Sequence, residues 1–328
     1  MRYLGSKTLL LDKIEHLIAN YEIPSTFCDP FGGIGTVGSY MKAKGYRVIT
    51  GDLLNFAHCF QMALVEMNEM PQFEKVKTAI GTDNVEEYLN QQNVEKGWLI
   101  EEYAEKRKFF TVKNAKRIQG CINCIDKWKQ NNLLQNGEYE ILIASIIQSF
   151  DKVANTAGTY YAYLKKYYRK AEGSFRFAFL HPVSGMLGCK AYLQDANDLV
   201  KKNKTDILYL DPPYNERNYG RYYHLPENVS LGVCPIPTGK SGMFVYHKTE
   251  SAYNKKLKAT VAFEELIRTA DTKCIIFHYT DDGIIKPQDA RDILLTKGNV
   301  EEFYLDCKGY STISGEKRTQ HHIFRVSC

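Results

Sequence analysis

The chain has 328 residues, of which 44% are hydrophobic and 25% are charged, and its formal net charge is +5. These values are ordinary for a globular protein and exclude a disordered chain, and the length allows one large domain or a domain with a sizeable insertion. No apolar stretch approaches the length of a membrane span, and the amino-terminal segment turns polar too soon for a signal peptide. The 9 cysteines are scattered and odd in number, so we expect reduced thiols in a cytoplasmic protein.

The amino-terminal segment predicts an amphipathic helix, because apolar residues recur at helical spacing from Leu10 to Ile18. Gly5 and Ser6 precede this run, where they would supply free backbone N–H groups and an N-cap. Such a helix start can hold a carboxylate, although an ordinary capped helix is the simpler explanation of the same residues.

A glycine-rich turn follows a short strand that ends in Cys28. The turn, FGGIG at residues 31–35, opens a helix, and its glycines let the backbone approach a ligand closely. Its spacing is not GxGxxG, and Asp29 beside it would repel a pyrophosphate and attract a ligand that carries an amino group. A second strand, residues 47–52, ends in Asp52, at the place where an acid commonly binds ribose hydroxyls. Turn, strand and acid together predict a nucleoside ligand.

Residues 71–177 predict an inserted, mainly helical subdomain, whose most apolar piece, residues 142–153, we expect to be its core helix. This insertion carries most of the basic runs, which are interleaved with tyrosines. Aromatic residues among cations suit a polyanion with stackable bases, although a solvated helix face is the commoner explanation of any single run. Cys121 and Cys124 have the CxxC form, but neither a second pair nor a nearby histidine completes a metal site, so we expect two thiols on a helix.

The most informative stretch is TDILYLDPPYN at residues 205–215. An apolar run that ends in two prolines predicts a buried parallel strand with a rigid loop at its carboxyl end, where open α/β sheets place their ligands. Prolines donate no backbone hydrogen bond, so the carbonyls of Asp211 and Pro212 remain acceptors. With the carboxylate of Asp211 they can accept both hydrogens of an exocyclic amino group while a planar ring stacks on Tyr214. A proline-rich turn without chemistry is the alternative.

The remaining segments complete an α/β pattern. Residues 188–196 predict a strand that ends in Asp195, which could contact a ligand or cap the following helix. A buried strand is expected at 274–279 and a helix at 289–296. Segments 300–305 and 322–326 predict an antiparallel pair around a polar loop, residues 309–320, which could reach a polyanion.

In this order, these pieces resemble the Dam-like, D12 class N6-adenine DNA methyltransferases of restriction-modification systems, which use S-adenosylmethionine. RYLGSK (2–7) resembles the amino-terminal cofactor motif of the family, FCDPFGGIG (27–35) its glycine loop and TGD (50–52) its ribose-binding acid. QDA (194–196) resembles its adenine-contacting segment, and LDPPYN (210–215) resembles its catalytic loop. The position of the insertion ahead of QDA also fits this family.

The resemblance implies a Rossmann-like α/β fold with a mostly parallel seven-stranded sheet in residues 1–70 and 178–328, and a target-recognition subdomain at 71–177. It implies catalysis by Asp211, Pro212, Pro213 and Tyr214. It implies S-adenosylmethionine binding by Tyr3, Gly5, Ser6, Lys7, Asp29, Pro30, Phe31, Gly33, Gly35, Thr36, Asp52, Leu53, Asp195 and Ala196. DNA contacts are expected from Arg2, Asn215, Arg217, Tyr219, Tyr222, Tyr160, Lys165, Lys166, Lys317 and Arg318.

The expected activity is therefore site-specific methylation of N6 of a flipped adenine in double-stranded DNA. We expect a monomer that needs neither metal nor membrane. A cognate restriction endonuclease is a candidate partner, and the sequence leaves its existence open. An RNA base methyltransferase stays an alternative, since some carry similar loops, and the insertion ahead of QDA favours DNA. A non-catalytic DNA-binding homologue is a second, and the presence of Asp211, Tyr214, Gly33 and Asp52 disfavours it. Asp29 and the missing GxGxxG disfavour a nicotinamide oxidoreductase.

Overall fold

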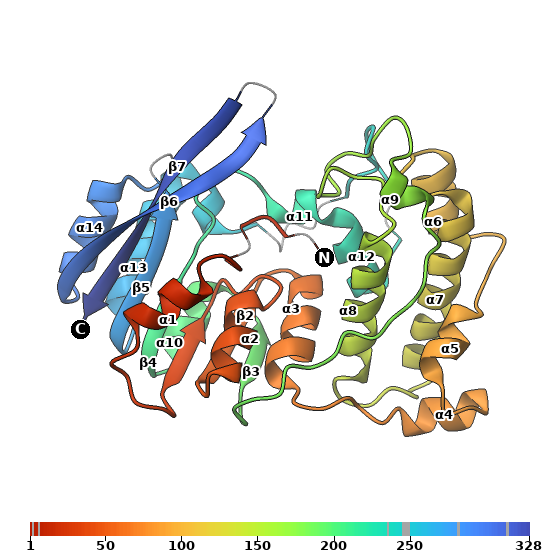
Figure 1. Ribbon diagram of the computed structural model, residues 1–328, viewed down its shortest axis with the longest axis horizontal. Helices are drawn as coiled ribbons and strands as arrows, with labels where there is room; N and C mark the ends of the chain where they lie inside the picture. Colours follow the sequence, from red (N-terminus) through yellow and green to blue (C-terminus); the bar gives the residue numbers. More distant parts are fainter. Residues whose placement is uncertain (2, 6, 235, 245–249, 281–282, 313–314) are drawn as a thin grey trace. The chain divides into compact units, whose positions relative to one another are not determined.

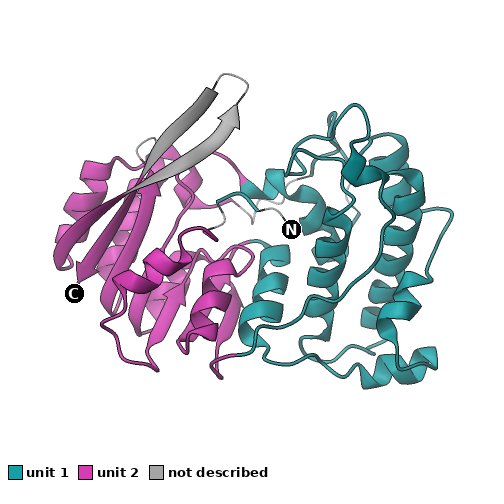
Figure 2. Cartoon of the chain, in the orientation of Figure 1, with its two compact units in different colours: residues 1–6, 54–184, 219–249 teal, residues 7–53, 185–218, 250–328 magenta. Residues whose placement is uncertain are grey.

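The computed structural model describes residues 1, 3–5, 7–234, 236–244, 250–280, 283–312 and 315–328, without the side chains of residues 305–320. The chain forms two compact units, which Figure 2 shows in different colours. Unit 1 comprises residues 1–6, 54–184 and 219–249, and unit 2 comprises residues 7–53, 185–218 and 250–328. Each unit is therefore assembled from segments that are distant in the sequence.

Unit 2 contains a seven-stranded sheet in the order β3-β2-β1-β4-β5-β7-β6 (Figure 1). The parallel strands are β1 (Thr26–Asp29), β2 (Arg47–Asp52), β3 (Lys190–Leu193), β4 (Thr205–Leu210) and β5 (Thr272–Thr280). The antiparallel strands are β6 (Asn299–Thr312) and β7 (Gly315–Ser327). The helices of this unit are α1 (Leu11–Leu17), α2 (Thr36–Ala43), α10 (Ala196–Lys202), η4 (Ala252–Asn254), α13 (Lys256–Thr269) and α14 (Pro287–Leu295). The predicted mostly parallel, seven-stranded α/β fold is confirmed.

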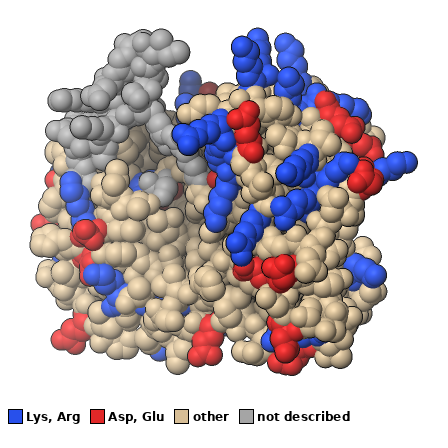
Figure 3. All heavy atoms as spheres, turned by 45° about the vertical axis from the view of Figure 1, so that its right-hand side comes forward, with Lys and Arg blue, Asp and Glu red and all other residues tan. Residues whose placement is uncertain are grey.

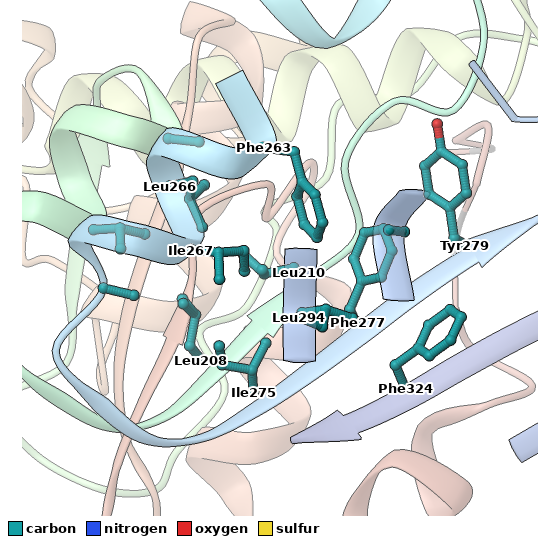
Figure 4. Packing of buried hydrophobic residues seen from close by; sticks show 14 of the residues in the cluster. Leu208, Leu210, Phe263, Leu266, Ile267, Ile275, Phe277, Tyr279, Leu294 and Phe324 are labelled. Atoms are coloured by element: carbon teal, nitrogen blue, oxygen red, sulfur yellow. The ribbon is translucent and has the colours of Figure 1, made fainter. Parts of the chain in front are cut away.

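The central strand β4 is buried on both faces, as expected for a parallel strand that helices cover. Leu208 and Leu210 point to one face, where they join a cluster with Phe263 of α13 and Leu294 of α14 (Figure 4). Tyr209 points to the other face, and its ring stacks on Phe27 of β1 at a centroid distance of 6.0 Å. The packing on both faces fixes the end of β4 rigidly in the sheet.

Two predicted boundaries in this unit are wrong. Helix α1 begins at Leu11 with Leu10 at its N-cap, so Gly5 does not cap it, and Ser6 lies outside the described residues. The segment 309–320 is not a loop, because β6 and β7 continue through most of it and pair as far as Thr312 and Gly315. Strands are held by hydrogen bonds between backbone groups, which polar residues can also form, so the polar composition was a poor guide to a loop.

Unit 1 is helical, as predicted for residues 71–177, and α8 is its most buried long helix. Its larger helices are α3 (Asn55–Gln61), α4 (Glu74–Ile80), α5 (Val85–Asn90), α7 (Val112–Gln130), α8 (Glu138–Asp151) and α12 (His224–Leu231). Shorter ones are η1 (Met62–Glu66), α6 (Trp98–Ile100), η2 (Glu101–Glu105), α9 (Arg169–Glu172) and α11 (Tyr219–Tyr222). Within the described residues, no helix combines the length and apolar character needed to cross a membrane.

Buried Glu227 of α12 links the segment 219–249 to the start of α3 within this unit. Its two carboxylate oxygens accept hydrogen bonds from the backbone N–H groups of Asn55 (3.0 Å) and Phe56 (3.1 Å). These groups open α3 and have no partner within the helix, so a distant carboxylate caps it. The compact unit thus extends beyond the predicted insertion at both ends, and the insertion boundaries 71 and 177 stay a prediction.

Candidate active site

The carboxyl ends of the central strands of unit 2 bring three acidic residues to one edge of the sheet. Asp29 ends β1, Asp52 ends β2 and Asp211 follows the last residue of β4. The strands are parallel neighbours, with Cys28 opposite Leu208. This is the edge at which α/β sheets bind ligands, so the acids predicted to act together do lie together.

Asp211 is held by two basic side chains. Lys7 Nζ lies 2.5 Å from its Oδ2, and His278 Nδ1 lies 3.2 Å from its Oδ1. Burial by itself would raise the pKa of Asp211, but the charge of Lys7 and the hydrogen bond from His278 outweigh it and hold the pKa below its ordinary value. Asp211 is therefore an ionised hydrogen-bond acceptor at neutral pH.

Neither basic partner was predicted for this role. From the sequence, we assigned Lys7 to the cofactor and did not include His278 in the site. The available signal was the position of His278 near the carboxyl end of a buried strand, β5, where α/β sheets place their functional residues. Leu210 lies opposite Phe277, so the next residue of each strand, Asp211 and His278, falls on the same side.

Asp29 is in the opposite protonation state. Its side chain is 2% exposed, and within the described residues its Oδ1 has no hydrogen-bond partner. Burial, and after it the charge of Asp211, raises the pKa of Asp29 to about 8. Because a buried polar atom without a partner costs free energy, a ligand group that donates a hydrogen bond or carries positive charge is favoured here.

The glycine turn meets the predicted ribose acid. The backbone N–H of Gly33 donates to Asp52 Oδ2 at 3.0 Å, and this bond joins the turn to the end of β2. Gly33 and Gly35 have φ of 50° and 76°, in the left-handed region that a residue with a side chain adopts at a cost. The turn is thus shaped by its glycines and anchored by the acid.

The other predicted cofactor residues are divided between the units. Asp195 caps α10, because its side chain accepts from the N–H of Asn197 at 2.9 Å, and its role toward an adenine stays a prediction. The residues that lie with it in unit 2 are Pro30, Phe31, Thr36, Leu53 and Ala196. Tyr3 and Gly5 belong to unit 1, where the ring of Tyr3 stacks on Tyr223 at a centroid distance of 5.0 Å.

The predicted DNA-contacting residues occupy different environments. Tyr160 is 1% exposed and its hydroxyl lies 3.0 Å from Asp151 Oδ1, so the prediction that it contacts DNA is wrong. Its neighbour Tyr161 is 46% exposed and stacks on Tyr222 at 4.9 Å. Lys165 and Lys166 are exposed. Tyr219 also lies in unit 1, Asn215 and Arg217 lie in unit 2, and Arg2 and the side chains of Lys317 and Arg318 lie outside the described residues.

The thiols of Cys121 and Cys124 lie on α7 and form no disulfide. Among the described residues, no group of three or more histidine, cysteine, aspartate or glutamate side chains could hold a metal ion. The chemistry of the site is therefore considered through its carboxylates, its basic residues and its backbone.

The chain is similar to known proteins. A model of the D12 class N6 adenine-specific DNA methyltransferase family matches residues 3–293. The chain is 34% identical over 312 residues to the type II methyltransferase M.FokI of Planomicrobium okeanokoites, covering 92% of this chain and 48% of that protein. It is 35% identical over 301 residues to the modification methylase StsI of Streptococcus sanguinis, covering 90% of this chain and 46% of that protein.

A third relative is similar in length. The type II methyltransferase M.NlaIII of Neisseria lactamica is 30% identical over 334 residues, which cover 97% of this chain and 95% of that protein. The chain thus spans about half the length of M.FokI and StsI and nearly all of M.NlaIII. With a family match over most of its length, and with the acids and glycines of its motifs at one sheet edge, the chain belongs to the D12 class N6 adenine-specific DNA methyltransferase family.

Proposed function

We propose that the chain transfers a methyl group from S-adenosylmethionine to N6 of a flipped adenine in double-stranded DNA, at a specific sequence. The observation that carries this proposal is the ionised Asp211, which Lys7 and His278 hold at the tip of a buried strand. Family membership supplies the class of base and of nucleic acid.

The residues present fit the cofactor. Asp29 Oδ1, which has no hydrogen-bond partner in the part of the chain that the structure describes, suits the ammonium group of the methionine part, and the turn at Gly33 suits its close approach to the backbone. Asp52 would bind the ribose, and Asp195 and Ala196 the adenine part. When bound, S-adenosylmethionine supplies a sulfonium methyl that is already activated for transfer.

The catalytic loop acts on the amino group. Adenine N6 is a weak nucleophile because its lone pair is delocalised into the ring, and hydrogen bonds from both N6–H groups favour a pyramidal nitrogen. Asp211 accepts one of these hydrogens and the Pro212 carbonyl the other. Positioning and electrostatics then lower the barrier without a covalent enzyme intermediate. N6 must also lose one proton as it gains the methyl group, and the ionised Asp211, which already accepts an N6–H, is the base within reach to take it.

Access to this loop requires the adenine to leave the duplex. A base stacked between its neighbours cannot reach the end of β4, so the enzyme flips it outward. Stacking on the partly buried ring of Tyr214 repays about 1–3 kcal/mol of the unstacking cost.

Unit 1 provides the charge for a duplex. Figure 3 turns the right-hand side of Figure 1 toward the viewer and shows Lys and Arg side chains gathered on this face. Exposed basic residues of unit 1 include Lys106, Lys108, Lys113, Lys165, Lys166 and Arg169. Cations in such number bind phosphates in a salt-dependent manner, while bases are read by other contacts.

The relatives are named type II methyltransferases and modification methylases. Their names support a role in a restriction-modification system, with a restriction endonuclease of the same specificity as partner. We propose a monomer as the acting form, which sedimentation of the free protein and of its DNA complex would test.

The activity is tested by incubating the purified chain with labelled S-adenosylmethionine and a library of duplexes, and with matched single-stranded RNA. Labelled N6-methyladenine in the duplexes at one sequence is the expected result. Incorporation into RNA alone would identify an RNA methyltransferase, and no incorporation into either would identify a binding protein without activity. Base-modification sequencing of host DNA, with and without the gene, then gives the recognition site.

Alanine at both Lys165 and Lys166 is expected to weaken DNA binding and to flatten its dependence on salt. Each lost phosphate contact lowers the slope of log K against log salt by about 0.9. Binding titrations over a range of salt concentrations measure the slope. Lys75→Ala, which removes an exposed lysine of α4, is the control. An unchanged slope in the double variant would remove both lysines from the interface.

Cofactor binding is expected to release a proton at pH 7. Asp29 is mostly protonated there, because its pKa is about 8, and an ammonium group beside it favours the ionised form. Affinity therefore rises as the pH approaches 8. Calorimetry with S-adenosylhomocysteine in buffers of different ionisation enthalpy should show a release of about one proton by the unchanged protein and none by Asp29→Asn. Equal release by both proteins would exclude contact with Asp29.

A further inference from the structure

Two histidines form a chain of hydrogen bonds that begins at Asp211 and leads away from the catalytic loop. His278 of β5 contacts Asp211 through Nδ1, and its other ring nitrogen, Nε2, lies 2.8 Å from Nδ1 of His321 on β7. Strands β5 and β7 are antiparallel neighbours, with Thr280 opposite His321 and His278 opposite Ile323. The two histidines are therefore diagonal neighbours on the same face of the sheet.

The contact between the rings is a directed hydrogen bond. The ring planes are inclined by only 11° and the centroids lie 4.9 Å apart, whereas the two nitrogens lie 2.8 Å apart. The distance between the ring centroids exceeds the distance between the two nitrogens by roughly two ring radii. This relation holds for two rings that lie in one plane and meet edge to edge. Rings stacked face to face would not bring these nitrogens to hydrogen-bond distance along their lone pairs.

The protons can be assigned along this chain of contacts. An ionised carboxylate only accepts, so His278 Nδ1 must carry the hydrogen that Asp211 Oδ1 receives. Burial, and then the charge of Lys7, lowers the pKa of His278, so the ring is neutral and its Nε2 is an acceptor. His321 Nδ1 must therefore be a donor. The hydrogen bond from His321 thereby selects the tautomer of His278 that can donate to Asp211.

We propose that His278 and His321 are positioning residues that, together with Lys7, hold the Asp211 carboxylate in the orientation in which it accepts the amino hydrogen of the target base. This proposal rests on the proposed function. Lys7 binds one carboxylate oxygen and His278 the other, so rotation of the carboxylate would break one of these contacts. The His278 side chain is only 1% exposed, so water cannot easily replace the lost contact. Each oxygen keeps a further lone pair for the substrate.

The replacement of each histidine by leucine and by asparagine separates positioning from packing. Leucine removes both ring nitrogens, whereas the asparagine amide can place an N–H where Nδ1 stood. His278→Leu should slow single-turnover methyl transfer about 10–100-fold, the loss of one hydrogen bond to a charged group, with cofactor and DNA affinities nearly unchanged. His278→Asn should recover a large part of this loss. His321→Leu should act in the same direction with a smaller loss, and His321→Asn should recover part of it.

The acid limb of the pH–rate profile reports the pKa of Asp211. A variant that only disturbs packing would not shift this limb. Loss of the donor raises the pKa of Asp211, so His278→Leu shifts the limb to higher pH and His278→Asn shifts it less. The charged and titratable groups that face His278 are Lys7, Asp211, His321 and His322. All of them stay in place in the two His278 variants. His181→Asn, at an exposed histidine, is the control.

The tautomers are measurable without catalysis. ¹⁵N NMR of the histidine rings in the unchanged protein should show hydrogen on Nδ1 of both His278 and His321 near neutral pH. Hydrogen on Nε2 of His278, or equal rates and equal acid limbs for His278→Leu and the unchanged protein, would overturn the proposal. If the unchanged protein methylates no nucleic acid, the proposed function fails, and the NMR result alone decides the orientation of the histidine pair.

Discussion

Asp211→Ala is expected to reduce methyl transfer by about 10²–10⁴-fold, the range for the loss of a positioned polar group in a transition state. The carboxylate is the acceptor that Lys7 and His278 hold at the end of β4, and alanine leaves the amino group without it. Asp211→Asn should also be severely impaired, because the amide carries no charge and offers Lys7 a weaker partner. Affinity for the cofactor should stay near that of the unchanged protein, because the glycine turn and Asp52 are intact.

Single-turnover transfer to a duplex with the recognition sequence measures the first effect, and calorimetry with S-adenosylhomocysteine measures the second. Asp198→Ala removes an exposed carboxylate from α10 and serves as the control. Because alanine leaves the buried Lys7 without its carboxylate, the thermal midpoint of each variant must be recorded. Full activity in a folded Asp211→Ala protein would contradict the role assigned to this residue.

Asp52→Ala is expected to weaken cofactor binding by about 10–100-fold, since hydrogen bonds to a charged group contribute about 1.5–3 kcal/mol. The carboxylate accepts from the N–H of Gly33, so its loss removes both the proposed contact with the ribose and the anchor of the glycine turn. Asp52→Asn separates the two, because its amide oxygen can still accept from Gly33 while the charge is lost.

Calorimetric titration with S-adenosylhomocysteine compares the two variants. If alanine weakens binding more than asparagine does, the difference is the contribution of the anchored turn. At saturating cofactor, transfer should recover in both variants, because Asp211 and its two basic partners are untouched. Unchanged affinity in Asp52→Ala would remove this residue from the cofactor site.

Much of the fold and half of the site follow from patterns local to a few residues. Strand β4 was predictable because an apolar run that two prolines end has few other conformations, and Gly33 with Asp52 because their spacing follows the βαβ unit. The contacts of Asp211 were not predictable in this way. Lys7 and His278 are distant from it in sequence, and only the register of β4 against β5 brings the histidine to its side.

Exposure was the weakest part of the prediction. Tyr160 and Tyr161 are adjacent in a segment without helical or strand periodicity, so no pattern tells which of them points inward. In the structure the first is buried and the second is exposed. The polar residues of 309–312 and 315–320 likewise lie in strands, because backbone pairing with the opposite strand is independent of side-chain polarity.

The way Glu227 closes the start of α3 limits how specificity could be exchanged between relatives. Segment 54–184 alone, moved as a cassette, would carry α3 and leave behind the carboxylate of Glu227 that caps it. A chimaera designed on the compact unit would have to carry segments 54–184 and 219–249 together, so that the acceptor and the two backbone donors come from one parent. Evolution of new recognition sequences in this scaffold is accordingly expected to proceed by coordinated change in these two stretches of the gene.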